Sequence, residues 1–106
     1  MHMTNREITT LMHRLFRGDL GPVEYVHLTV DDQLERARVD DLLARFIPGS
    51  DLLIFVDQNH CAFSSREKAF ENIRKFIPHG RVKIADSLFQ GHVIIEPLGV
   101  GAGYAI

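Results

Sequence analysis

Asp57, His60 and Cys61 have the clearest potential for catalysis, and they lie in one short polar stretch, DQNHC. A cysteine thiol beside an imidazolium, or near a helix N-terminus, ionises readily and becomes a nucleophile. The pattern therefore favours a small cysteine-dependent hydrolase or transferase. Neighbouring side chains of an extended segment point to opposite faces, so His60 can serve Cys61 only if a turn redirects it. The alternative interpretation is a polar turn followed by a small buried cysteine.

Metal ligands and phosphate-binding loops lack the spacing that they need. The six histidines form no HxH, HxxxH or HExxH pattern, and a single cysteine cannot build a zinc site of several thiolates. The glycines between Gly99 and Tyr104 are not followed by a predicted helix, whose N-terminus would hold a phosphate. We therefore predict no metal and no cofactor.

Acidic residues in and just before the second predicted helix are the strongest indication of function. Asp31 and Asp32 are placed to cap that helix, where negative charge is favourable. Asp is a poor helix former in mid-helix, so the later acidic residues indicate a charged surface rather than a structural need. We predict that this surface binds a protein partner with a basic surface. The predicted partner-binding residues are Asp31, Asp32, Glu35, Asp40 and Asp41.

Basic residues gather in the third predicted helix, which makes nucleic-acid binding a further alternative. Glu67 and Glu71 lie between these basic residues, as is typical of a solvated helix surface. Binding to nucleic acid gains from many phosphate contacts, and the formal net charge is −2. We therefore regard nucleic acid as a disfavoured partner. The residues that would contact it are Arg66, Lys68, Arg74 and Lys75.

Three amphipathic helices are predicted to position these residues. Apolar residues recur at helical intervals in each of them, and capping residues, glycine or proline mark their ends. The second and third helices end in the similar stretches RFIPGS and KFIPHG, which we interpret as the same way of ending a helix. The helices are predicted from a capping box at Thr4 to Gly18, from Asp31–Asp32 to Pro48, and from a second capping box at Ser64 to Pro78.

The most informative predicted strand is the continuous apolar run from Leu52 to Val56. A strand without polar alternation is covered on both faces of its sheet. Other strands are predicted over residues 23–30, 61–63, 81–87 and 92–97. The glycine-rich tail is predicted to permit a bulge or a close backbone approach, with Tyr104 and Ile106 pairing at an edge.

These elements predict one small α/β (or α+β) domain over residues 1–106, with the order α-β-α-β-(β)-α-β-β-(β). We prefer a mixed sheet of four to five strands with three helices. Right-handed crossovers between parallel neighbours would place the second and third helices on one face and the first helix on the other. In the alternative, residues Leu52–Phe63 form a hairpin and the whole sheet is antiparallel.

Composition indicates the cellular compartment and the class of function that we expect. No apolar run approaches the roughly 18 residues that span a membrane, and one cysteine fits a reducing compartment, so we expect a cytoplasmic protein. A compact domain with an acidic helix and no convincing catalytic set fits a small inhibitor, immunity protein or adaptor better than an enzyme. Pairing of the terminal strand with a copy of itself would make a homo-oligomer.

Overall fold

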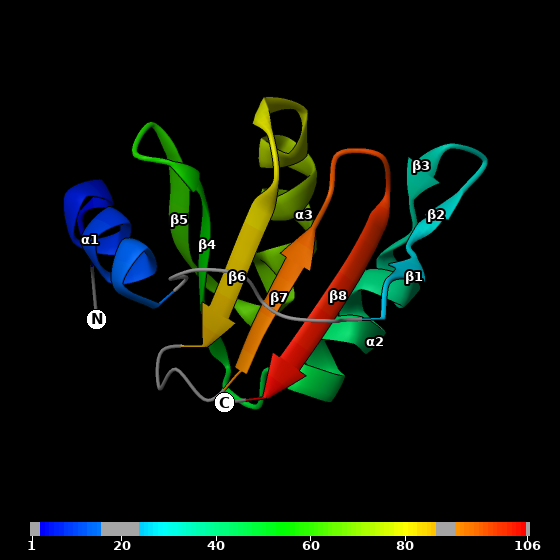
Figure 1. Cartoon of the computed structure of the whole chain (residues 1–106), viewed down its shortest axis with the longest axis horizontal. Coiled ribbons are helices and arrows are strands. Elements are labelled where there is room, and N and C mark those ends of the chain that lie inside the picture. Colours follow the sequence, from blue (N-terminus) through cyan, green and yellow to red (C-terminus); the bar gives the residue numbers. More distant parts are fainter. Residues whose placement is uncertain (1–2, 16–23, 87–90, 106) are drawn as a thin grey trace.

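The computed structural model describes residues 3–15, 24–86 and 91–105 (Figure 1). The helices are α1 (Asn5–Leu15), α2 (Arg36–Phe46) and α3 (Arg66–Phe76), and α3 continues into the short 3-10 helix η1 (Ile77–His79). The strands are β1 (Val26–His27), β2 (Thr29–Val30), β3 (Gln33–Leu34), β4 (Asp51–Asp57), β5 (His60–Ser65), β6 (Val82–Asp86), β7 (Gly91–Ile95) and β8 (Val100–Ala105). The predicted α/β class with three helices is confirmed. None of the described helices combines the length and apolar character needed to cross a membrane.

Six strands form one sheet in the order β1-β8-β7-β6-β4-β5, and β2 pairs with β3 in a separate hairpin. Every strand pair among the described residues is antiparallel. Our preference for parallel neighbours is therefore wrong, and the alternative with a hairpin over Leu52–Phe63 is observed. The reason is that β5 returns the chain beside β4 before α3 begins. β6 consequently enters the sheet antiparallel to β4.

The β2–β3 hairpin occupies the predicted start of the second helix. Asp31 and Asp32 form its turn, with φ of +53° and +63°. A type I′ hairpin turn requires this left-handed conformation at both central positions, and Asp is among the residues that tolerate it. The prediction that these residues cap α2 is therefore wrong. Glu35 precedes the helix instead, without a side-chain capping hydrogen bond.

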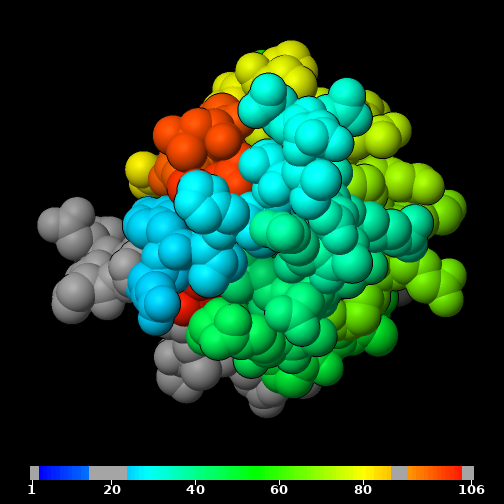
Figure 2. Space-filling view, turned by 90° about the vertical axis from the view of Figure 1, so that its right-hand side faces the viewer, coloured from blue at the N-terminus to red at the C-terminus, as the bar shows by residue number. Residues whose placement is uncertain are grey.

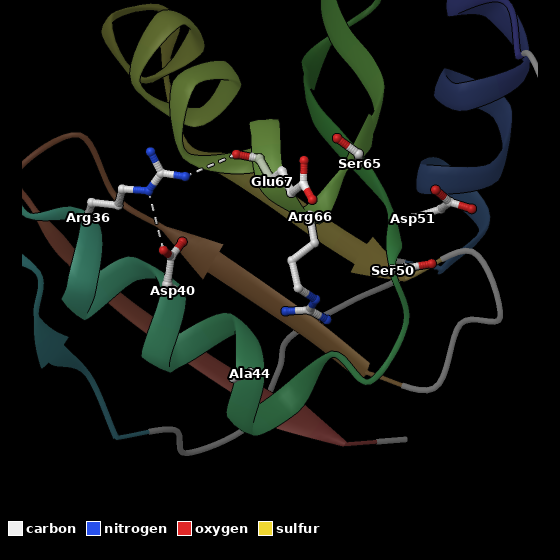
Figure 3. A pocket seen from close by; sticks show the side chains of 8 residues that line it. All are labelled: Arg36, Asp40, Ala44, Ser50, Asp51, Ser65, Arg66 and Glu67. Atoms are coloured by element: carbon white, nitrogen blue, oxygen red, sulfur yellow. Dashed lines mark hydrogen bonds and ion pairs between the residues drawn. The ribbon is translucent and has the colours of Figure 1, made fainter.

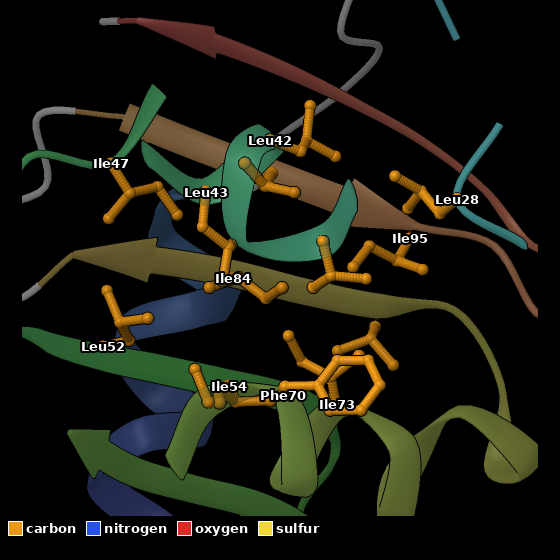
Figure 4. Packing of buried hydrophobic residues seen from close by; sticks show 14 of the residues in the cluster. Leu28, Leu42, Leu43, Ile47, Leu52, Ile54, Phe70, Ile73, Ile84 and Ile95 are labelled. Atoms are coloured by element: carbon orange, nitrogen blue, oxygen red, sulfur yellow. The ribbon is translucent and has the colours of Figure 1, made fainter. Parts of the chain in front are cut away.

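The two layers of helices are those predicted, although the prediction assumed parallel neighbouring strands. α2 and α3 cover one face of the sheet, where Ile54 and Ile84 belong to the larger core (Figure 4). α1 packs on the other face, where Ile8 meets Leu53 and Phe55 (Figure 1). β4 thus has buried side chains on both faces, which explains its unbroken apolar sequence.

Helix ends follow the local sequence at most positions. Thr4 Oγ1 accepts the N–H of Glu7 at 3.2 Å, and Glu7 Oε1 accepts the N–H of Thr4 at 3.2 Å, so the first capping box is confirmed. α2 and α3 end at Phe46 and Phe76, the residues before each Ile-Pro pair. The predicted stop of the first helix at Gly18 lies outside the described residues.

The second predicted capping box does not form, and α3 begins one residue later than that box implied. Ser65 precedes α3 and makes no side-chain capping hydrogen bond. The Ser64 hydroxyl is used elsewhere, because it donates to the carbonyl of Ser65 and accepts from Asn72 Nδ2, both at 2.9 Å. Ser64 therefore ties α3 to β5 rather than capping the helix.

The glycines of the tail allow α2 to approach the sheet. β8 has β7 along its length, whereas β1 pairs with it only at Val100 and Gly101. Tyr104 pairs with His92 of β7 where no described strand lies on the other side of β8, and Ile106 lies outside the described residues. A Cβ atom at Gly103 would lie 2.3 Å from the Phe46 ring, and one at Gly101 would lie 2.7 Å from Leu28. The predicted close backbone approach is therefore confirmed, because only glycine leaves this space.

Candidate functional site

The three catalytic candidates do not converge on one site. The Asp57 carboxylate lies 2.8 Å from Nδ1 of His60 across the β4–β5 turn, and this hydrogen bond lowers the pKa of Asp57. Cys61 belongs to the core cluster on the α1 side of the sheet, where its Sγ lies 3.9 Å from the carbonyl oxygen of Asn5. His60 stacks instead on His79 of η1, with ring centroids 3.8 Å apart. His60 and Cys61 thus point to opposite faces, as strand alternation requires.

Burial makes Cys61 a poor nucleophile. Its residue surface is 8% exposed. Burial raises the pKa of the thiol, and the nearby charge of Asp57 raises it further. The reactive thiolate is therefore disfavoured. Among the described residues, no group of three or more His, Cys, Asp and Glu side chains could hold a metal ion.

The five acidic candidates fall in four places. Asp31 and Asp32 are exposed at the tip of the β2–β3 hairpin, which stands beside α2 (green) and the β7–β8 turn (orange) in Figure 2. Glu35 pairs with Arg38 at 3.5 Å. Asp40 and Asp41 are adjacent in sequence but lie about 100° apart around the helix axis, so they line different grooves. The structure does not unite these residues in one acidic face.

Asp40 lies in a groove of about 690 Å³ between α2, the start of β4 and the first turn of α3 (Figure 3). Ala44 contributes only a methyl group to its wall, which leaves the groove open. Both the acidic and the basic candidate sets reach this groove, through Asp40 and Arg66 respectively. The lining residues are Arg36, Asp40, Ala44, Ser50, Asp51, Ser65, Arg66 and Glu67.

The two arginines of the groove are engaged by the fold itself. Arg36 Nε lies 3.5 Å from the Asp40 carboxylate, and Arg36 Nη2 donates to the carbonyl of Glu67 at 3.1 Å (Figure 3). Arg66 donates through Nε to the carbonyl of Gly49 at 3.0 Å and through Nη2 to the carbonyl of Ile47. These carbonyls follow the end of α2, where a cation is favourable. Arg66 is therefore a structural residue that caps α2.

The mouth of the groove carries two carboxylates besides that of Asp40. Glu67 and Asp51 are exposed. Figure 3 shows the Glu67 side chain between Arg36 and Ser65, and Asp51 turned away from Arg36 at the far rim. The groove can thus offer negative charge to an incoming cation while both of its own cations are held. Sequence reasoning missed Arg36, Asp51 and Glu67, because only the packing of α2 beside α3 brings them together.

The other basic candidates separate around α3. Arg74 lies near Phe70, with Cζ 5.9 Å from the ring centroid, and lines a groove beside the β2–β3 hairpin. Lys68 and Lys75 are exposed, and helical spacing places them on the opposite flank from Arg74. With Arg66 committed to α2, the four residues do not form one basic surface.

Comparisons with known protein families, with curated protein sequences and with solved structures find no match for this chain.

Proposed function

We propose that this protein is a binding module that recognises a partner protein with a basic surface through the α2–α3 groove. The observation that carries the proposal is the pairing inside the groove. Arg36 and Arg66 each donate to backbone carbonyls of the fold, while the carboxylates of Glu67 and Asp51 stay exposed.

A lysine or arginine side chain of the partner would enter this groove and meet Glu67, with Asp40 beside it. An exposed ion pair contributes about 0.2–1 kcal/mol, so the charges mainly orient the partner and accelerate association. Most of the affinity would come from surfaces packed around the groove. Asp31 and Asp32 at the hairpin tip can steer the same partner at longer range.

Stoichiometric binding is the activity that fits such a surface. Cys61 is buried away from His60, so the cysteine-dependent alternative draws no support from the geometry. Within the binding class, we propose the role of an inhibitor, immunity protein or adaptor, each of which acts by occupying a surface of another protein.

The test compares two neutralised variants in capture from native lysate. Asp40→Asn with Glu67→Gln removes two negative charges from the groove. Asp31→Asn with Asp32→Asn removes the same charge from the hairpin tip, and Asn also tolerates positive φ. We expect the groove variant to lose a protein that the wild type and the hairpin variant both retain.

Equal retention by all three proteins would remove the groove from consideration. Loss with the hairpin variant alone would transfer the binding surface to the hairpin. Thermal unfolding of each variant controls for folding, because surface substitutions of this kind change stability by about 0.5 kcal/mol or less.

A further inference from the structure

β5 is an edge strand, paired only with β4 among the described strands. The N–H of Arg66 donates to the carbonyl of Ser50 at 2.8 Å and continues the β4–β5 ladder by one step. Hydrogen-bonded pairs alternate along an antiparallel ladder. Ala62 and Ser64 therefore bond to β4, whereas the N–H and C=O groups of Cys61 and Phe63 and the N–H of Ser65 point outward. The Ser65 carbonyl accepts the Ser64 hydroxyl at 2.9 Å.

Among the described residues, this outer row of backbone groups lacks the usual protection of a sheet edge. Natural edge strands carry lysine, proline or a bulge, or another element covers them. β5 reads HCAFSS and contains neither lysine nor proline. No other described element makes a backbone hydrogen bond to its outer side. α1 meets β5 through the side chains of Cys61 and Phe63, which lie on one face of the strand.

The flank of α3 that borders this edge is basic. Asn72 Nδ2 donates to Ser64 Oγ at 2.9 Å, so the side of α3 that carries Asn72 runs along β5. Residues four before and three after Asn72 share that side of the helix, and they are the exposed Lys68 and Lys75. Glu71 is turned about 100° from Asn72, away from the sheet, and its spacing of three from Lys68 and four from Lys75 makes it a surface neighbour of both lysines.

We propose that the β5 edge binds an extended, acidic segment of another protein by strand addition. The outward backbone groups would form the new ladder, and alternate side chains of the added strand would face α3. Acidic side chains there would meet Lys68 and Lys75, and apolar side chains on the other face would meet the partly buried Phe63. This surface lies on the opposite flank of α3 from the α2–α3 groove and does not depend on it.

A second copy of the chain is a poorer occupant of this edge than an acidic segment. Two β5 strands related by a two-fold axis would pair antiparallel and would set the two α3 helices side by side. Lys68 and Lys75 of one copy would then face the same lysines of the other. An acidic strand removes this repulsion.

Ser65 offers a matched pair of substitutions. Its φ is −70°, which proline adopts without strain, and its N–H points outward. Ser65→Pro therefore removes one donor from the edge and places a ring in the path of an added strand. Ser65→Ala keeps the N–H and controls for loss of the hydroxyl, which makes no capping hydrogen bond.

The probe is a fluorescent peptide of alternating valine and glutamate, measured by fluorescence anisotropy. We expect saturable binding by the wild type and by Ser65→Ala, and none by Ser65→Pro. Neutralising Lys68→Gln with Lys75→Gln should weaken binding about tenfold, because two ion pairs are lost. Arg74→Gln, on the other flank of α3, should leave binding unchanged.

Two further peptides make the test independent of the folding of Ser65→Pro. One peptide alternates valine with lysine, and the other is the valine–glutamate peptide with a proline at its centre. Each should bind at least about tenfold more weakly than the first probe. Absence of saturable binding by the valine–glutamate peptide, or equal binding by the lysine peptide, would overturn the proposal. A dimer in sedimentation that Ser65→Pro dissociates would also overturn it, because a second copy would then occupy the edge.

Discussion

Cys61 is a thiol that the fold keeps protonated. Because burial and the charge of Asp57 both raise its pKa, we predict slow labelling by a thiol reagent at pH 7 in the folded protein and rapid labelling after denaturation. The labelling rate of the folded protein should rise at higher pH than for a free cysteine. Rapid labelling of the folded protein at pH 7 would contradict this account.

The raised pKa of Cys61 also makes the folding stability depend on pH. Since the pKa of the thiol is higher in the folded state than its ordinary value of 9.0, the native state holds this proton more tightly. The resulting stabilisation is fully present below pH 9.0 and is lost as the pH rises through the folded-state pKa.

At the residue scale, strand alternation was enough to separate His60 from Cys61. Spacing could not reveal that His79 stacks on His60.

Among the elements, α2 depends on the glycines of β8. We predict that Gly103→Ala lowers the free energy of unfolding by about 1–3 kcal/mol, because its Cβ would overlap the Phe46 ring. Denaturant unfolding measures this change. Phe46→Leu introduced into the Gly103→Ala background should recover part of the loss. Additive effects of the two substitutions would mean that Gly103 and Phe46 do not contact each other.

The β2–β3 hairpin depends on its turn residues. Asp31 and Asp32 both have positive φ, so Asp31→Asn with Asp32→Gly should raise the free energy of unfolding by about 0.5–1 kcal/mol. Asp32→Val should lower it, because a β-branched residue is strained in this conformation. The midpoint of urea unfolding distinguishes the two directions. An unchanged midpoint in both variants would show that the turn contributes little to stability.

Helices and strands were predicted where a long apolar pattern repeats, as in α3 and β4. The pattern failed at short elements. Asp31 and Asp32 suit both a helix cap and a hairpin turn, and the structure has the turn, with Leu34 of β3 packed against the core. β5 was recognised as a short return strand, yet its effect on the direction of β6 depends on which strands pair, and local sequence does not encode that choice.

On the scale of the whole molecule, α3 separates two surfaces of opposite charge. Glu67 faces the groove beside α2, and Lys68 and Lys75 border the β5 edge. The acidic helix was expected from the sequence, but its acidic residues turned out to be distributed over several sites. The groove joins α2, the start of β4 and α3, so its residues could not be found from spacing within any one segment.

We propose that a basic partner binds the α2–α3 groove. The most direct test is chemical-shift mapping of the ¹⁵N-labelled protein against the partner retained in the capture experiment. We expect the largest shifts to fall on Arg36, Asp40 and Glu67, and to disappear with Asp40→Asn and Glu67→Gln. Shifts confined to the hairpin tip or to the β5 edge would contradict it.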